Sequence, residues 1–276
     1  MHYVRYGEPG QEKPGMLDDH GRIRDLSGVI PDLAGAVLGD LPKVDPDSLP
    51  LVPGNPRLGP PVAQVGKFIG IGLNYADHAA EAGMEPPAMP IVFMKATSSI
   101  CGPNDPVYLP RGAEKGDWEV ELGVVLGKTA KYVSEAEALD YVAGYCIVND
   151  VSERAFQMER VGQWTKGKSA DTFGPIGPWL VTPEGAGDPQ ALDLSLDLNG
   201  SRVQTGNTST MIFSVAQIIS HLSEMMSLQP GDIIATGTPP GVGMGMKPPR
   251  FLREGDVMEL AIDGLGHQRQ EVRRDS

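Results

Sequence analysis

Glycine and proline interrupt this sequence so often that it can form few long helices. The 276 residues include 35 glycines and 25 prolines, a little over a fifth of the chain. Proline removes a backbone donor and disrupts helix interiors and central strands, and both residues favour turns. They follow no period, so the composition indicates neither collagen nor a disordered chain. We therefore expect a turn-rich fold that is mostly β-structure with some α-helix, and with long functional loops.

Local patterns predict two hairpins and one long helix. The Asn-Gly pair at 199–200 and the Asp-Gly pair at 263–264 lie between strand-like runs. Such pairs are strong signals for tight β-hairpin turns. Apolar residues recur at helical spacing over 215–226, and Ser214 with Gln217 matches a capping box at the start of that segment.

The first 63 residues differ in composition from the rest of the chain. Short runs at 3–6 and 22–24 are typical of strands, and a short helix is expected over 31–38. Prolines then recur from residue 42 to residue 61, which forbids a regular helix or a central strand and predicts an extended surface connector. We expect a small N-terminal domain with its connector at 1–63, and a larger domain at 64–276.

The overall charge limits the classes of partner. Formal net charge is −13 at pH 7, and such a surface repels phosphate backbones, so nucleic-acid binding is not expected. A small anionic ligand is compatible, because a bound divalent cation reverses the local field. The sequence shows no membrane-length apolar stretch and no signal-peptide core. Cys101 and Cys146 match no ligand pattern, so we expect reduced thiols in a cytoplasmic protein without membrane contact.

Three acidic residues are candidate metal ligands. Residues 117–125 alternate strictly, so Glu119 and Glu121 point to the same side of an expected strand. Asp150 follows a later apolar run, where a buried strand would end. Carboxylates are preferred ligands of Mg²⁺. The residues alone leave a second interpretation open, namely a solvated strand face and a capping box formed by Asp150 and Glu153.

A histidine and a glutamate share one face of an expected short helix. Asn74 is a candidate cap for this helix and Gly83 a candidate end. His78 and Glu81 are three residues apart, so their side chains are neighbours. A carboxylate beside an imidazole orients it and raises its basicity, which suits a base that activates water. An exposed helical pair without chemical function is the alternative.

Residues 162–169 match the phosphate-binding pattern GxxxxGK[ST]. That motif needs a strand before the loop and a helix after it, so that the helix N-terminus faces the phosphates. Here residues 152–160 are charged and helix-like, and residues 170–178 contain the glycines and prolines that prevent a helix. The pattern therefore predicts no ATPase.

Six segments in this order resemble the fumarylacetoacetate hydrolase family, over about residues 64–270. Each is weak by itself, but the ordered set is specific and favours the metal site and the His–Glu dyad over their alternatives. The segments are GxNYxxHxxE (72–81), FMK (93–95), DWEVELGVVLGK (117–128), NDVSERAFQ (149–157), GKSADTFGPIGPW (167–179) and GDIIATGTPPGVG (231–243).

The resemblance implies a role for each matched position. It implies a mixed β-sandwich roll that forms a homodimer, and a Mg²⁺ or Mn²⁺ ion held by Glu119, Glu121 and Asp150. His78 and Glu81 match a catalytic dyad on a lid, and Lys168 matches a lysine that stabilises developing negative charge. The implied contacts with a small anionic 2-oxo acid come from Gln157, Thr238, Gly237, Lys95 and Arg154.

The resemblance also implies a reaction class. Only about 63 residues precede the likeness and the dyad is His-x-x-Glu, unlike animal fumarylacetoacetases. Short bacterial members that hydrolyse 2,4-diketo-3-deoxy sugar acids, or are ureidoglycolate lyases, are more similar. The implied reaction is hydrolysis of a carbon–carbon bond in a 2,4-diketo acid (an acylpyruvate or a sugar acid), with release of pyruvate. Oxaloacetate decarboxylation, a ureidoglycolate lyase, a hydroxymuconate-type isomerase and an inactive metal-binding protein stay open. We expect specificity from rim residues Met84, Glu85, Gln163 and Trp164.

Overall fold

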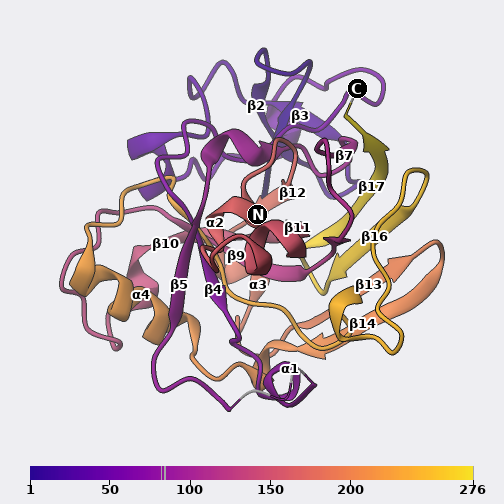
Figure 1. Ribbon diagram of the computed structural model, residues 1–276. Helices are drawn as coiled ribbons and strands as arrows, with labels where there is room; N and C mark the ends of the chain where they lie inside the picture. The colour runs from indigo at the N-terminus through magenta and orange to yellow at the C-terminus, as the bar shows by residue number, and fades with distance from the viewer. Residues whose placement is uncertain (82, 84, 276) are drawn as a thin grey trace.

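The computed structural model describes residues 1–81, 83 and 85–275. A mixed ten-stranded sheet runs through the molecule in the order β3-β2-β1-β12-β10-β9-β15-β4-β5, with β6 joined to β12 (Figure 1). Its strands are β1 (His2–Tyr6), β2 (Lys13–Leu17), β3 (Ile23–Asp25), β4 (Phe68–Gly72), β5 (Ile91–Lys95), β6 (Ile100–Cys101), β9 (Val120–Leu126), β10 (Val142–Asn149), β12 (Gly174–Val181) and β15 (Ile233–Ala235).

A second, five-stranded sheet has the order β14-β13-β16-β17-β7. Both predicted hairpins are confirmed in it: residues 199–200 join β13 to β14, and residues 263–264 lie between β16 and β17. Asn199 and Gly200 have φ values of 53° and 75°, the left-handed geometry that tight hairpin turns require. The remaining strands are β7 (Val107–Leu109), β13 (Asp193–Leu198), β14 (Ser201–Asn207), β16 (Val257–Ile262), β17 (Gly266–Arg274), and the separate pair β8 (Gly116–Asp117) and β11 (Ser152–Glu153).

Helices are short, with one exception. The helices are α1 (Ala76–Glu81), α2 (Thr165–Lys168), α3 (Pro183–Ala186) and α4 (Val215–Met225), with 3₁₀ turns at Gly35–Gly39, Pro46–Ser48, Thr97–Ser99, Ala138–Tyr141, Thr208–Thr210 and Gly243–Gly245, and a π-turn at Ala155–Glu159. The predicted capping box of α4 is confirmed, because Ser214 and Gln217 bond each other's backbone N–H. Within the described residues, no helix is long and apolar enough to cross a membrane.

Each face of the main sheet has its own hydrophobic core, because successive side chains of a strand point to opposite faces. Val124 and Ile147 belong to the cluster that packs against α4 and the five-stranded sheet. Their neighbours Val125 and Val148 belong to a second cluster with residues of the N-terminal segment. Burying each such aliphatic side chain stabilises the fold by about 1.5–3 kcal/mol. Both cysteines are buried and free, as the sequence predicted.

The N-terminal segment extends the main sheet. β1 pairs antiparallel with β12, and Tyr3, Leu33 and Leu38 are buried in the second cluster. The strands expected at 3–6 and 22–24 are present, and β2 lies between them in sequence. The helix expected over 31–38 is instead the 3₁₀ turn Gly35–Gly39. The domain boundary at 63/64 stays a prediction.

Two further local expectations are corrected by the structure. The strand expected over 117–125 is divided, so that Trp118 and Glu119 lie between β8 and β9. Asn74 does not cap α1, because its side chain donates to the carbonyls of Phe213 and Thr236 and accepts from the Phe213 N–H. The long-range bonds therefore replace the local cap, and they hold the segment before α1 against two distant loops.

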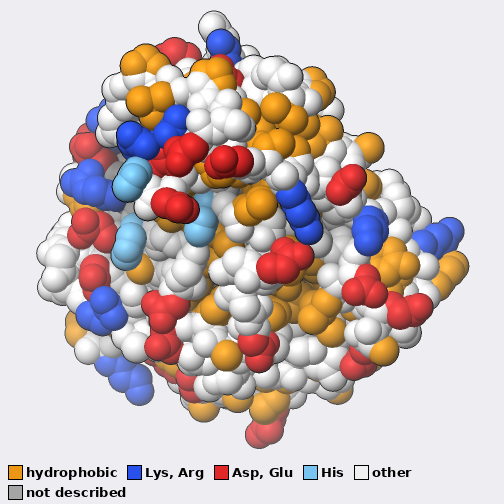
Figure 2. All heavy atoms as spheres, turned by 180° about the vertical axis from the view of Figure 1, so that it is seen from behind, with side chains coloured by type: hydrophobic (Ala, Val, Ile, Leu, Met, Phe, Trp, Pro, Cys, Tyr) orange, Lys and Arg blue, Asp and Glu red, His pale blue; other side chains and the backbone are white. Residues whose placement is uncertain are grey.

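The surface carries both signs of charge. On the face shown in Figure 2, acidic and basic side chains are interspersed, and hydrophobic side chains gather in the upper part of the view. The face shows no continuous basic stripe of the kind that tracks a phosphate backbone.

Candidate metal centre and active site

Glu119, Glu121 and Asp150 bring three buried carboxylates together. One oxygen from each lies within 4.8 Å of the others. The arrangement follows from strand pairing, because Asn149 at the end of β10 is opposite Val120 at the start of β9. The Asp150 N–H then donates to the Glu119 carbonyl at 2.9 Å. The pairing of these antiparallel strands thus places Glu119 and Asp150 side by side, although they are 31 positions apart in the chain.

Two lysines contact these carboxylates. Lys168 Nζ donates to Glu119 Oε2 at 2.7 Å and to Asp150 Oδ2 at 2.6 Å. Lys95 Nζ donates to Asp150 Oδ1 at 2.6 Å and to the Val151 carbonyl at 3.2 Å. Both ammonium groups are almost fully buried. Lys168 lies at the end of the short helix α2, and Lys95 at the end of β5.

Arg154 links the carboxylates to a further acidic residue. Its guanidinium donates to Glu119 Oε1 at 2.6 Å, to Asp117 Oδ2 at 2.8 Å and to Gln157 Oε1 at 3.1 Å. Asp117 is fully buried and was not identified from the sequence as a site residue. It also accepts the N–H groups of Gly243 and Met244, at 2.7 and 3.0 Å. Asp117 therefore ties the loop 241–246 to the metal-ligand candidates.

Together these residues form a charged floor with more acidic than basic groups. Burial alone would raise the pKa of Glu119, but Lys168 and Arg154 outweigh burial and lower that pKa to about 2. Burial, together with the charges of Asp150 and Glu119, raises the pKa of Glu121 well above its usual value. The four carboxylates and three cations of the charged floor are Asp117, Glu119, Glu121, Asp150, Lys95, Arg154 and Lys168.

A divalent cation fits this charged floor. Hard cations take oxygen ligands, and three carboxylates offer them from one side. The raised pKa of Glu121 shows that its neighbours supply too little positive charge for a third buried carboxylate. The Gly237 N–H donates a hydrogen bond to this carboxylate at 2.8 Å. A bound cation would supply the missing charge and would make the floor attractive to an anion.

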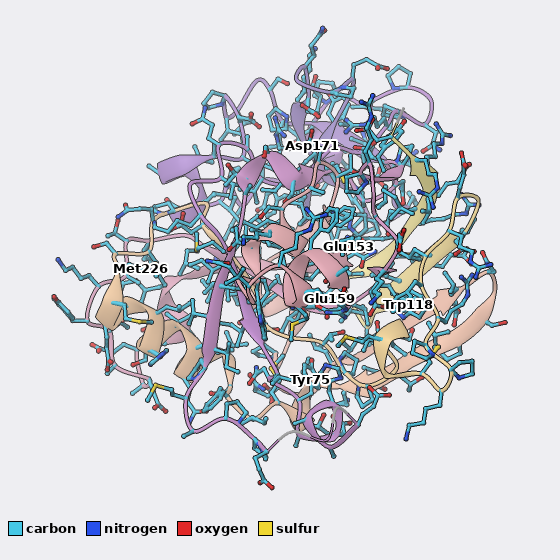
Figure 3. All side chains as sticks on the ribbon, viewed as in Figure 1. Tyr75, Trp118, Glu153, Glu159, Asp171 and Met226 are labelled. Carbon is cyan, nitrogen blue, oxygen red and sulfur yellow. The ribbon has the colours of Figure 1, made fainter. Side chains whose placement is uncertain are left out.

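The helix α1 carries the predicted His–Glu pair. His78 Nδ1 and Glu81 Oε2 are 3.3 Å apart, and His78 is buried. The Glu81 carboxylate also accepts the Gly241 N–H at 3.1 and 3.2 Å, so α1 is fastened to the loop 241–246. Tyr75, labelled in Figure 3, precedes α1 and is fully buried. The dyad is therefore held from both ends of its short helix.

Five residues of the charged floor and both residues of the dyad line one cavity of about 510 Å³. The three metal-ligand candidates line this cavity, and so do six other predicted site residues: His78, Glu81, Arg154, Gln157, Lys168 and Thr238. Thr238 is fixed by donating to the Val120 carbonyl and by accepting from Gln204 Nε2. A volume of this size is in the range of small-molecule sites.

A family comparison is consistent with this geometry. Residues 67–273 match the model of the fumarylacetoacetate (FAA) hydrolase C-terminal family. The chain belongs to the fumarylacetoacetate hydrolase family. A Burkholderia cenocepacia protein, named only as a candidate hydrolase, is 65% identical over 99% of both chains. The predicted mixed β-fold with some α-helix is confirmed by this membership and by the architecture.

Solved structures of the fumarylacetoacetate hydrolase family share the whole fold. A fumarylacetoacetate hydrolase from Exiguobacterium antarcticum is 37% identical, with a TM-score of 0.90 and full coverage of both chains. A 2-hydroxyhepta-2,4-diene-1,7-dioate isomerase from Mycobacterium marinum is 34% identical, with a TM-score of 0.77, covering 100% of this chain and 99% of the isomerase. A maleylpyruvate hydrolase from Sphingobium sp. SYK-6, in complex with manganese(II) and pyruvate, is 28% identical, with a TM-score of 0.83 and full coverage of both chains.

These findings support the coarser functional predictions. Family membership and the names of the relatives support an enzyme of hydrolase or lyase type. The three clustered carboxylates and the manganese of a relative support a divalent cation. The individual roles of the site residues stay predictions.

The structure separates the predicted substrate contacts into two groups. Gln157, Thr238 and Arg154 line the cavity, whereas Lys95 and Gly237 are not among the described residues that line it. Lys95 and Gly237 instead contact the carboxylates, at Asp150 and Glu121 respectively.

The predicted rim residues also divide into those that line the cavity and those that do not. Trp164 lines the cavity, but Gln163 and Glu85 are not among its described lining residues, and Met84 lies outside the residues that the structure describes. Sequence reasoning missed Phe93, Met158, Met244 and Met246, which also line the cavity. Only the unusual run GVGMGM at 241–246 could have pointed to two of them.

Neither alternative interpretation of the motifs is supported. The Glu153 carboxylate accepts N–H groups of Glu114, Lys115 and Phe156, so it forms no capping box with Asp150. The phosphate-binding pattern at 162–169 follows the π-turn rather than a strand, and its Lys168 is buried between carboxylates.

Trp118, labelled in Figure 3, connects the charged floor to the same loop as Asp117. Its indole N–H donates to the Gly241 carbonyl.

Proposed function

We propose that this protein is a divalent-metal-dependent hydrolase that cleaves a carbon–carbon bond in a 2,4-diketo acid and releases pyruvate. The observation that carries the proposal is the meeting of a charged floor and a His–Glu dyad in one cavity. The floor suits the binding of a 2-oxo acid head, and the dyad suits the activation of water. A relative with maleylpyruvate hydrolase activity in its name, complexed with manganese and pyruvate, supports the same class.

The metal would be held by Glu119, Glu121 and Asp150. When bound, it supplies Lewis acidity toward the carboxylate and 2-oxo oxygens of the substrate. Mg²⁺ and Mn²⁺ are both compatible with three carboxylates. Arg154 orients Glu119 through a bond of 2.6 Å, and Lys95 orients Asp150 in the same way. These bonds hold the ligand set in place before substrate arrives.

His78 is the proposed base. When its Nδ1–H faces Glu81, its Nε2 is free to take a proton from water. The water oxygen adds to the 4-oxo carbon, and the bond between C3 and C4 breaks with its electron pair moving to C3. Lys168 stabilises the negative charge of the pyruvate enolate that leaves. The enolate then takes a proton at C3, which gives pyruvate and a carboxylic acid.

An isomerase is the second candidate, and it is favoured by one observation. The chain is 34% identical to a 2-hydroxyhepta-2,4-diene-1,7-dioate isomerase over its whole length. Moving a proton between carbons needs a base and enolate stabilisation but no added water. The same floor could therefore serve an isomerase, with His78 carrying the proton.

The substrate and assembly proposals rest on the family resemblance. We propose a small anionic 2-oxo acid as the partner, and a homodimer as the assembly. No nucleic acid or membrane partner is proposed. Light scattering at several protein concentrations tests the dimer, since a constant mass near 29.4 kDa would contradict it.

The deciding experiment is a pyruvate-release assay with Mg²⁺ or Mn²⁺. Acylpyruvates, 2,4-diketo-3-deoxy-rhamnonate or -fuconate, and oxaloacetate are compared as substrates. Pyruvate from a diketo acid, abolished by EDTA and by Glu119→Ala, is the expected result. Pyruvate from oxaloacetate alone would indicate a decarboxylase. Turnover of ureidoglycolate, or a shift of the dienol absorbance without pyruvate, would indicate a lyase or the isomerase.

A further inference from the structure

The cavity has a second part whose chemistry differs from that of the charged floor. We call this part the apolar wall, and its members are Ile71, Phe93, Met158, Trp164, Met244 and Met246. These side chains carry one indole N–H and no hydroxyl, amide or guanidinium group. Methionine sulfur is only a weak acceptor. Lys247, an exposed residue, also lines the cavity beside this wall.

Two glycines of β4 seat the aromatic half of the apolar wall. A Cβ atom at Gly70 would lie 2.2 Å from Phe93 Cζ, and one at Gly72 would lie 2.4 Å from Trp164 Cζ3. The Phe93 and Trp164 rings therefore pack directly against the backbone of these glycines, with the ring centroids 5.5 Å apart. A side chain at either glycine would displace a ring. The strand sequence FIGIG thus leaves space for a continuous aromatic surface.

Two methionines of the apolar wall, Met244 and Met246, belong to the loop 241–246, whose backbone is held by hydrogen bonds. Asp117 accepts the N–H groups of Gly243 and Met244, and the Trp118 indole donates to the Gly241 carbonyl at 3.1 Å. On this segment Met244 is exposed and Met246 is half-buried, and both line the cavity. Unbranched thioether side chains adapt to ligands of different shape. The segment therefore combines a fixed position with an adaptable apolar surface.

We propose that the group on the far side of the scissile bond is apolar, an alkyl or aryl acyl group, in preference to a polyhydroxylated sugar chain. This inference rests on the proposed function, because the charged floor fixes the 2-oxo acid head of the substrate. The remainder of the substrate must then lie against the rest of the cavity. Several hydroxyls placed on the apolar wall would lose water, and the wall itself offers them only the Trp164 indole N–H, which disfavours binding.

The first test compares two substrates on the Mn²⁺-loaded protein. Hexanoylpyruvate presents an alkyl group, and a 2,4-diketo-3-deoxy sugar acid of similar length presents hydroxyls. We expect kcat/KM to be on the order of 100-fold higher for hexanoylpyruvate, a discrimination typical of apolar pockets. Equal values, or a preference for the sugar acid, would overturn the inference and leave the hydrolase proposal standing.

A binding measurement separates the inference from the reaction. Calorimetry compares 2-oxooctanoate with a hydroxylated 2-oxo acid of the same length, neither of which can be cleaved as a diketone. Tighter binding of 2-oxooctanoate, by about tenfold or more, is expected. If no diketo acid releases pyruvate, the proposed function is wrong, and this comparison still decides whether the cavity prefers an apolar group.

A matched pair of variants locates the preference. Met246→Gln puts an amide of similar length on the apolar wall, and Met225→Gln makes the same change on the exposed side of α4, away from the cavity. The ratio of kcat/KM between the two substrates, and the ratio of the two binding constants, should fall about tenfold for Met246→Gln only. An unchanged ratio in Met246→Gln would show that the apolar wall does not select the substrate.

Discussion

Two clusters in this protein each combine carboxylates with basic side chains but balance their charge differently. In the hairpin of β2 and β3, Asp18 accepts from Arg22 Nε and Arg24 Nε, both at 2.9 Å. It also accepts the N–H groups of His20 and Arg22, while Arg24 reaches Asp47 at 2.6 Å. Two carboxylates therefore meet two guanidinium groups. In the charged floor, four carboxylates meet three cations.

The difference appears in the pKa values. At Asp18, burial would raise the pKa, but the hydrogen bonds from the backbone and from the arginines outweigh it and hold that pKa well below its usual range. At Glu121, burial and two neighbouring carboxylates raise the pKa well above its usual value. The balanced charges around Asp18 therefore stabilise the fold, whereas the excess negative charge of the charged floor, which lies at a cavity, suits a cationic ligand.

The largest effect is expected when the excess carboxylate, Glu121, is removed from the charged floor. We expect Glu121→Gln to weaken Mn²⁺ binding by more than about 100-fold, since changes even behind a ligand cost 10- to 100-fold. In EDTA the same variant should melt at a higher temperature than the parent, because like-charge repulsion is relieved. Titration calorimetry and scanning calorimetry measure the two effects. A lower melting temperature in EDTA would show that the imbalance does not strain the metal-free protein.

Lys168 tests whether the floor also serves the reaction. Lys168→Met should lower kcat for a 2,4-diketo acid by about 100-fold or more, because a preorganised donor to the developing charge is lost. Lys128→Met, at an exposed lysine, is the matched control and should change little. A loss below about threefold in Lys168→Met would contradict the proposed role.

The dyad should affect catalysis without affecting the metal. Glu81→Gln removes the carboxylate that orients His78 and accepts the Gly241 N–H. We expect kcat for hydrolysis to fall by about 10- to 100-fold, while Mn²⁺ affinity is unchanged. This loss is at or below the lower end of the contribution of general-base chemistry, because His78 itself remains. Steady-state kinetics measures the loss of kcat and calorimetry measures Mn²⁺ affinity. A parallel loss of Mn²⁺ binding would mean that α1 supports the charged floor itself.

The smallest effect is expected in the balanced cluster. Asp18→Asn should lower the melting temperature by only a few degrees and leave activity intact. The pKa of Asp18 is lower in the folded state, so its contribution is full above the unfolded value of about 3.9 and is lost as pH falls toward the folded value. The melting-temperature difference between parent and variant should therefore shrink between pH 7 and pH 3. A constant difference would indicate a packing effect instead of a charge effect.

Much of the fold could be predicted from local patterns. The turns at 199–200 and 263–264 and the capping box of α4 depend on neighbouring residues, and all three are present. Predictions failed where a distant partner outcompeted a local one. Asn74 bonds Phe213 and Thr236 instead of capping α1. The capping box of Asp150 and Glu153, which the residues alone left open as an alternative, is not formed either, because Glu153 bonds the segment at 114–115.

The sequence by itself was enough to name the candidate ligand and catalytic residues Glu119, Glu121, Asp150, His78 and Lys168, because the ordered motifs that carry them resemble those of the family. Tertiary structure alone decided what surrounds them. The pairing of β9 with β10 creates the charge imbalance, and the path of the loop 241–246 brings Met244 and Met246 to the same cavity as the ligands. Local patterns carry no information on such contacts, because they join segments that are far apart in the chain and are fixed only when the whole sheet has formed.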